Sequence, residues 1–257
     1  MFSFNDKLDH LSNSRLNLIQ HEVKRYISSD DYKAYSSLVF PVDRAIEIHF
    51  NQYQRVIKSL ATLNEQATHD DEGQLKLNSM LMAALTEIHG YLSSQLSMFD
   101  TLEHHARKHG LSNYFISDYD SFRNSSITQF FLIYKNNILN EFNFLPLLQF
   151  NSGKGYQKLV YRVDEWVQLE EWTRLQDFFL SLGEFVVIDK LLEEYYDNAC
   201  DVLDRYQKNI LNNNKHVVEK VLSTLLGFVT KYEALGQNGF LPVTRSYLEK
   251  KFRDIER

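Results

Sequence analysis

A lysine and a cluster of amides make residues 133–147 the segment whose side chains could do chemistry. Lys135, Asn136 and Asn140 recur on the polar side of an expected helix, and Pro146 forbids the continuation of that helix. Lys135 carries a positive charge but lacks the planar fork with which an arginine matches a phosphate. Asn140 has no titratable proton near neutral pH, so these residue types favour binding over acid-base catalysis.

The same residues resemble the motif helix of HEPN domains, the higher eukaryotes and prokaryotes nucleotide-binding family. Its ribonuclease members carry an arginine, usually followed by a polar residue, and a histidine four to six residues later. In this chain Lys135, Asn136 and Asn140 take those places, so both catalytic side chains are replaced. The resemblance extends over about residues 41–211 and includes Pro146-Leu147 and the acidic, tyrosine-containing segment 188–206.

The resemblance implies a mode of action for such a degenerate domain: dimerisation with the motif helices facing each other, and binding of RNA or a partner protein. It implies a homodimer whose cleft contains Lys135, Asn136 and Asn140 from both chains. Family context implies a role in bacterial defence or in a toxin and antitoxin pair. Because the catalytic residues are replaced, we expect a non-catalytic protein.

Two other functions stay open. Arg44 and His49 satisfy the family spacing literally, with four residues between them, and would make the protein an active metal-independent ribonuclease. Alanine follows Arg44, however, and no Pro-Leu pair ends that helix. The other function is that of a helical protein-protein interaction module or regulatory subunit, in which Lys135 and its amide neighbours are only a solvated helix face.

Two further clusters contain side chains of the types that bind metal ions. His105 and His109 are four residues apart and share one side of a helix, but alanine stands at 106 where a general base would lie, and two ligands do not make a site. Glu193, Asp197 and Asp201 follow one another at helical spacing without the Glu-x-x-His motif of di-metal bundles. We expect a solvated helix end and an exposed acidic face, with no metal and no cofactor.

Composition excludes some partners. The 257 residues carry a formal charge of −6, so strong binding to duplex DNA or to an acidic membrane is not expected. No apolar run approaches the roughly 20 residues of a membrane helix, and the N-terminus has no signal-peptide pattern. One cysteine, Cys200, excludes an intrachain disulfide. These features indicate a cytoplasmic protein.

Few prolines and glycines interrupt the chain, which predicts long helices and an all-α fold. We expect a single helical domain over residues 1–257, built as a bundle of long antiparallel helices, with a core at about 41–211 and a helical extension at about 212–257. Two short β-prone runs around a glycine-containing turn predict a small hairpin near 147–163. The predicted helices cover residues 41–67, 75–109, 118–142, 169–182, 186–211, 216–235 and 242–257.

Overall fold

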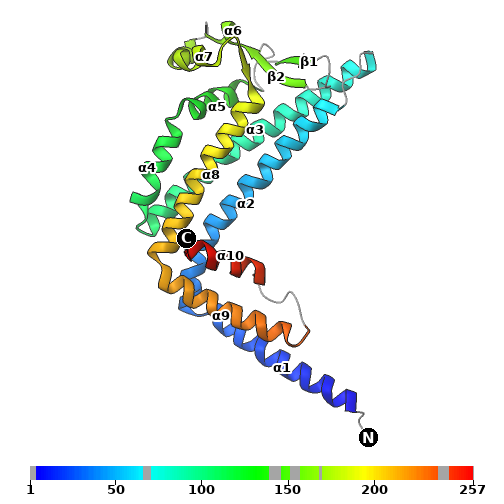
Figure 1. Ribbon diagram of the computed structural model, residues 1–257, viewed down its shortest axis with the longest axis vertical. Coiled ribbons are helices and arrows are strands. Elements are labelled where there is room, and N and C mark those ends of the chain that lie inside the picture. The colour runs from blue at the N-terminus through cyan, green and yellow to red at the C-terminus, as the bar shows by residue number, and fades with distance from the viewer. Residues whose placement is uncertain are drawn as a thin grey trace. The chain divides into compact units, whose positions relative to one another are not determined.

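The computed structural model describes residues 4–65, 71–138, 146–150, 157–167, 170–236 and 243–256. Over these residues the fold is all-α with one small antiparallel sheet, as predicted (Figure 1). The chain divides into two compact units. Unit 1 comprises Met1–Asp43 and Arg205–Arg257, and unit 2 comprises Arg44–Asp204. The division differs from the predicted core and extension because the N-terminal residues belong with the C-terminal segment.

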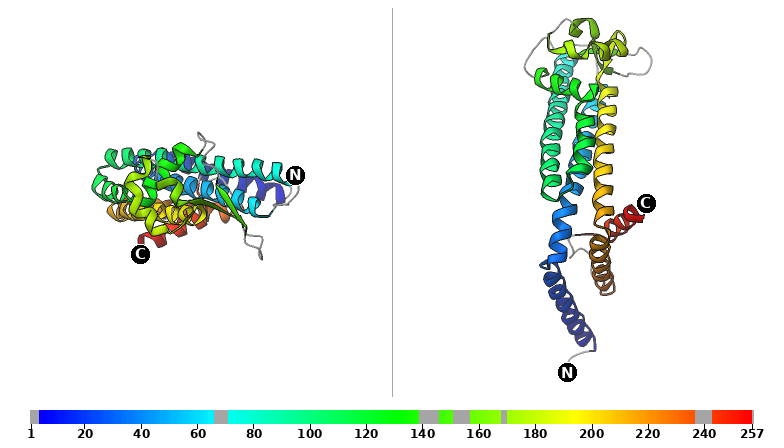
Figure 2. Two further views of the ribbon diagram at one scale, coloured as in Figure 1. Left: turned by 90° about the horizontal axis from the view of Figure 1, so that it is seen from above. Right: turned by 90° about the vertical axis from the view of Figure 1, so that its left-hand side faces the viewer.

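Unit 2 contains most of the two long helices α2 and α8, together with α3 and all the short elements between α3 and α8. The bounds of its elements are α2 (Asp30–Glu65), α3 (Asp71–Lys108), α4 (Ser112–Arg123), α5 (Ser126–Asn137), β1 (Leu147–Phe150), β2 (Gln157–Arg162), α6 (Val163–Val167), the 3-10 helix η2 (Glu170–Leu175), α7 (Gln176–Leu182), β3 (Phe185–Val187) and α8 (Ile188–Asn213). Figure 2 gives two further views of these elements.

Helices α2 and α3 lie antiparallel, as predicted. His49 contacts Gln95 while Tyr53 contacts Tyr91, so residue numbers rise along one helix as they fall along the other. Helix α3 ends at the predicted glycine: Gly110 has a φ of 70°, and its N–H and that of Leu111 donate to carbonyl groups of the last helical turn. The two helices thus bring apolar stripes of period 3.6 together in one core.

The predicted start of α2 at Pro41 was wrong, because the helix begins at Asp30 and carries Pro41 inside it. Ser29 caps the helix by accepting a hydrogen bond from the N–H of Tyr32, 3.3 Å away. A buried apolar stripe continues across the proline, from Leu38 on one side to Val42 on the other. Packing of that stripe outweighs the one backbone hydrogen bond that proline removes.

The single helix predicted over 118–142 is two helices, α4 and α5. The chain breaks at Asn124 and Ser125, and the Ser125 side chain accepts a hydrogen bond from the N–H of Thr128, which caps α5. Helix α5 ends at Asn137, earlier than predicted. Asn140 and the predicted end of the helix at Phe142 lie outside the described residues.

The predicted hairpin is confirmed, and a third strand extends it. Strands β1 and β2 pair antiparallel from Leu147 opposite Val160 to Phe150 opposite Gln157. Strand β3 pairs with β2, with Val186 opposite Tyr161. The prediction of a helix from residue 186 was therefore wrong at its start, because β-branched residues there join the sheet before α8 begins at Ile188.

The predicted helix at 169–182 starts as the 3-10 helix η2 and becomes α-helical in α7. Its Trp172 is fully buried and stacks on Trp166, with ring centroids 5.0 Å apart. These rings pack against Phe130 of α5, so the short elements between the strands fix the position of that helix.

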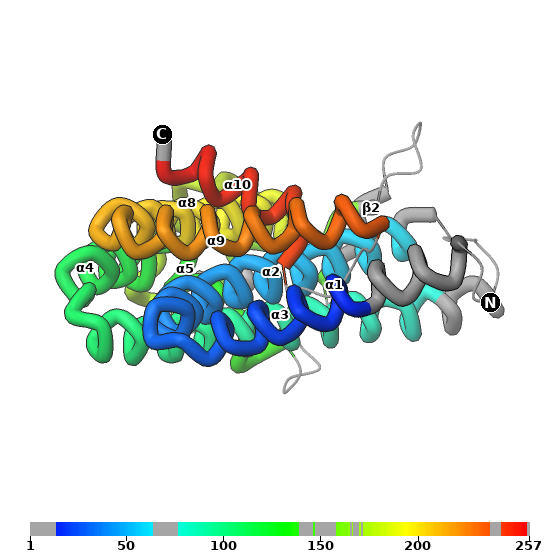
Figure 3. The backbone as a smooth tube through the Cα atoms, turned by 90° about the horizontal axis from the view of Figure 1, so that it is seen from below, coloured from blue at the N-terminus to red at the C-terminus, as the bar shows by residue number. Residues whose placement is uncertain are grey.

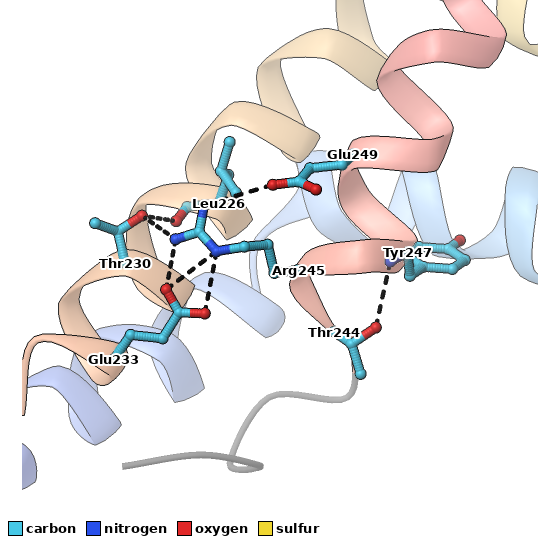
Figure 4. A network of polar contacts seen from close by, with 7 residues as sticks. All are labelled: Leu226, Thr230, Glu233, Thr244, Arg245, Tyr247 and Glu249. Carbon is cyan, nitrogen blue, oxygen red and sulfur yellow. Dashed lines mark hydrogen bonds and ion pairs between the residues drawn. The ribbon is translucent and has the colours of Figure 1, made fainter. Parts of the chain in front are cut away.

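Unit 1 contains α1 (Phe4–Ile27), α9 (Lys215–Glu233) and α10 (Arg245–Glu256), of which α9 and α10 were predicted. Helix α1 lies along α9 (Figure 3), where Val23, Phe228 and Tyr232 form a small buried cluster. Helix α10 is held to α9 by Arg245, whose guanidinium donates to Glu233 and Thr230 (Figure 4). No helix in the described part of the chain is long and apolar enough to cross a membrane.

Candidate functional site

Lys135 lies in the last turn of α5, and the apolar side of that helix determines where it points. Phe130, Phe131 and Tyr134 are buried on one side of α5, so residues on the other side of this helix face outward. Lys135 is half-buried and Asn136 is exposed. The aromatic packing on the buried side of α5 therefore fixes the positions of Lys135 and Asn136.

A histidine of α3, His89, lies close enough to Lys135 for the lysine charge to act on it. His89 is half-buried and follows the fully buried Ile88 on α3, the helix against which α5 packs. Burial lowers the pKa of the His89 imidazole, and the nearby Lys135 ammonium lowers it further. Lys135 and His89 thus lie on two helices that pack together, and both side chains are partly exposed to solvent.

No carboxylate pairs with either group among the described residues. Every ion pair of that part of the chain involves other cations. Burial, and after it the charge of the Lys135 ammonium, lowers the pKa of His89 and so favours the neutral imidazole. A bound anion would oppose the effect of that charge, because it attracts the ammonium and also favours protonation of the imidazole. The arrangement is suited to an anionic group such as a phosphate.

His89 was not among the residues that the sequence predicted. It is far from Lys135 in sequence, and periodicity within one helix says nothing about which residue of another helix packs beside it. Of the predicted set, Lys135 and Asn136 lie together on α5, while Asn140 is not described.

The structure does not bring Arg44 and His49 together. Arg44 is exposed, whereas the His49 side chain is 1% exposed and lies between α3 and α8. Its Nδ1 is 2.6 Å from Oε1 of Gln95, its Nε2 is 3.4 Å from the backbone oxygen of Tyr196, and its ring stacks on that of Tyr196. Burial lowers the pKa of His49, as expected for a neutral imidazole in a core. A substrate held by Arg44 would not reach it.

The two histidines weighed as metal ligands do share one side of α3, with ring centroids 4.6 Å apart. His105 is buried, and burial lowers the pKa of His109. The described residues contain no group of three or more His, Cys, Asp or Glu side chains that could hold a metal ion.

Comparisons of the chain with family models, with curated proteins and with solved structures give no match. The resemblance to HEPN domains therefore stays a prediction from the residues of the motif helix and the order of the elements around it.

Proposed function

We propose that this chain is a HEPN-like, non-catalytic protein of the cytoplasm that binds single-stranded RNA through Lys135 and His89. The observation that carries the proposal is the Lys135 and His89 pair, two nitrogen groups from different helices with no carboxylate partner among the described residues. Phosphate groups of a strand would supply the missing negative charge. Asn136, exposed one residue further along α5, would add an amide contact to sugar or base.

The same geometry argues against cleavage. Cleavage of an RNA phosphodiester by acid-base catalysis needs one group that accepts a proton and one that donates a proton. Burial and the Lys135 charge lower the pKa of His89, which makes its imidazole a poorer source of a proton. Binding without turnover is the expected outcome.

The direct test is the affinity of a fluorescently labelled, unstructured oligoribonucleotide, measured by anisotropy at several salt concentrations. Lys135→Gln should weaken binding roughly tenfold at low salt, since a charge-assisted contact is lost. The slope of log affinity against log salt should become shallower by about 0.7, the value for one phosphate contact on a single strand. Lys58→Gln is the matched control, because Lys58 is an exposed lysine on α2 in the same unit.

Each part of the proposal can fail separately. Equal affinity of the wild type, Lys135→Gln and His89→Gln would overturn the assignment of the site. Shortened RNA products that disappear in His89→Gln would overturn the non-catalytic assignment and favour an active ribonuclease.

The expected homodimer is a separate element of the proposal and rests on the family resemblance. Two α5 helices facing each other would place two Lys135 ammonium groups in one cleft, which an RNA strand would bridge. Sedimentation of the purified chain with and without the oligoribonucleotide measures whether the chain is a monomer or a dimer. A monomer in both conditions would contradict it.

A further inference from the structure

One side of α2 carries an apolar strip that the fold of unit 2 leaves uncovered. Phe50 is 50% exposed and Ile57 is 40% exposed, and they lie two helical turns apart on the same side. Ile46, half-buried, and Ala61, exposed, extend the strip by one turn at each end. The buried stripe of α2, which includes Tyr53, runs next to it. We call Ile46, Phe50, Ile57 and Ala61 the α2 strip.

Acidic side chains of α8 border the α2 strip. The two helices are neighbours in unit 2 (Figure 1), since the Tyr53 ring stacks on Tyr196 with centroids 4.0 Å apart. Glu193 and Asp197 lie on α8 within one turn of Tyr196. Burial raises the pKa of Tyr53 to about 12, and the charges of these two carboxylates add to that rise. Both carboxylates are exposed. Glu47, exposed on α2 itself, adds a third carboxylate.

These carboxylates have no cation partner in the part of the chain that the structure describes. Every ion pair there uses other acidic residues, such as Asp43, Glu103 and Glu233. Glu193 and Asp197 are four residues apart, one helical turn, and so repel each other. This surface combines exposed aliphatic and aromatic groups with uncompensated negative charge. It fits a ligand that carries apolar side chains next to positive charge.

We propose that the α2 strip, with Glu193 and Asp197 at its edge, docks a basic amphipathic helix of a partner protein. Aliphatic side chains of that helix would cover Phe50 and Ile57, and lysine or arginine residues on its flank would pair with the carboxylates. Nucleic acids and acidic membranes carry the wrong charge for this face. A second copy bound face to face is also disfavoured, because a two-fold contact would set the same carboxylates against each other.

The test uses a synthetic peptide of about 18 residues, long enough to form a helix, with leucine on one face and lysine on the other. A peptide with glutamate in place of lysine controls for apolar attraction alone. Anisotropy of the labelled lysine peptide should give saturable binding to the whole chain, and the glutamate peptide should bind at least about tenfold more weakly. Equal binding of the two peptides would overturn the proposal.

Matched variants locate the binding face. The double variant Glu193→Gln with Asp197→Asn should weaken the lysine peptide about three- to tenfold, because two exposed ion pairs are lost. Glu194→Gln is the control, since this exposed carboxylate of α8 lies on the side away from Tyr196 and its loss should change affinity less than twofold.

Phe50→Ser tests the apolar part of the face and should weaken the lysine peptide by about tenfold or more. Its side chain is half exposed, so the substitution should leave the circular dichroism spectrum unchanged. Unchanged affinity in Phe50→Ser and in Glu193→Gln with Asp197→Asn would overturn the assignment. Self-association of the wild type that Phe50→Ser abolishes would also overturn it, because the occupant would then be a second copy.

Discussion

The ion pair between Lys251 of α10 and Asp43 of α2 gives the sharpest test of how unit 1 is held together. The Lys251 side chain is 4% exposed and the Asp43 side chain 18% exposed, and their nitrogen and oxygen atoms are 2.5 Å apart. Asp43 also accepts hydrogen bonds from Nε2 of Gln207 at 2.7 Å and from the hydroxyl of Tyr247 at 2.5 Å. The Tyr247 hydroxyl is in turn 3.3 Å from that of Tyr35.

Removal of either charge should be costly because the other is then left buried. Breaking a buried pair typically destabilises a protein by about 3–5 kcal/mol. The destabilisation by Asp43→Ala should lie at the upper end of this range. The substitution leaves the Lys251 ammonium without a carboxylate and also removes the acceptor of Gln207 and Tyr247. Lys251→Met should cost about 2–3 kcal/mol, because the carboxylate keeps two neutral donors and some exposure to water.

The double variant Asp43→Asn with Lys251→Met removes both charges and keeps an oxygen acceptor for the two donors. It should cost less than Asp43→Ala alone, and a cycle completed with the single variants Asp43→Asn and Lys251→Met should give a coupling energy of at least about 2 kcal/mol. Urea unfolding followed by circular dichroism measures the free energies, and hydrogen exchange of α10 amides reports whether the loss is local to that helix.

Arg245→Gln supplies the control on the same helix. Its ion pair with Glu233 is well formed at 2.5 Å, but the two side chains are 37% and 40% exposed. An exposed pair contributes at most about 1 kcal/mol, so Arg245→Gln should change the free energy of unfolding little. A cost below about 1 kcal/mol for Lys251→Met, or strict additivity of the charge removals, would refute the argument that burial makes the Asp43 pair decisive.

Two predictions concern other elements. Burial raises the pKa of Asp189 from 3.8 to about 6, so the folded state binds the proton more tightly, and the contribution of Asp189 to stability should be greatest below pH 4 and fall as the pH rises to 6. Asp189→Asn should remove this fall, so its free energy of unfolding in urea should gain about 2 kcal/mol relative to the wild type between pH 4 and pH 7. Parallel curves of unfolding free energy against pH for the two proteins would contradict this. Gly110→Ala should cost about 1 kcal/mol in thermal unfolding because the φ of Gly110 is 70°. Gly227→Ala, inside α9 with no atom within 4 Å of the new Cβ, should instead stabilise by about 0.5–1 kcal/mol, and equal signs for the two glycines would refute the backbone argument.

The long helices could be predicted from the sequence because each buries one stripe of apolar residues and ends at a recognisable signal. Gly110 ends α3 and the predicted hairpin pairs as β1 with β2, since both depend on residues close together in the chain. Pro41 misled the prediction of α2, because its helix-start preference is a local signal and the buried stripe around it extends further toward the N-terminus.

The elements that could not be predicted depend on contacts between distant segments. Val186 becomes a strand residue only because Tyr161 is there to pair with it, and the same run would otherwise continue into the helix. The candidate site shows the same limit. Lys135 was evident from the spacing on its own helix, whereas His89 joins it only through the packing of α3 against α5.

The distribution of paired and unpaired charges supports treating the two proposed surfaces as separate. In unit 1 two lysines of α9 have carboxylate partners within 3.0 Å: Lys220 pairs with Asp31 and Lys231 with Glu22. In unit 2 Lys135 has none among the described residues, although the chain holds 34 acidic residues, and Glu193 has no basic partner there. Each unpaired group therefore keeps its charge available for a ligand. Because the two groups have opposite sign, an anionic strand and a cationic helix cannot compete for one surface, and the loss of one interaction should leave the other intact.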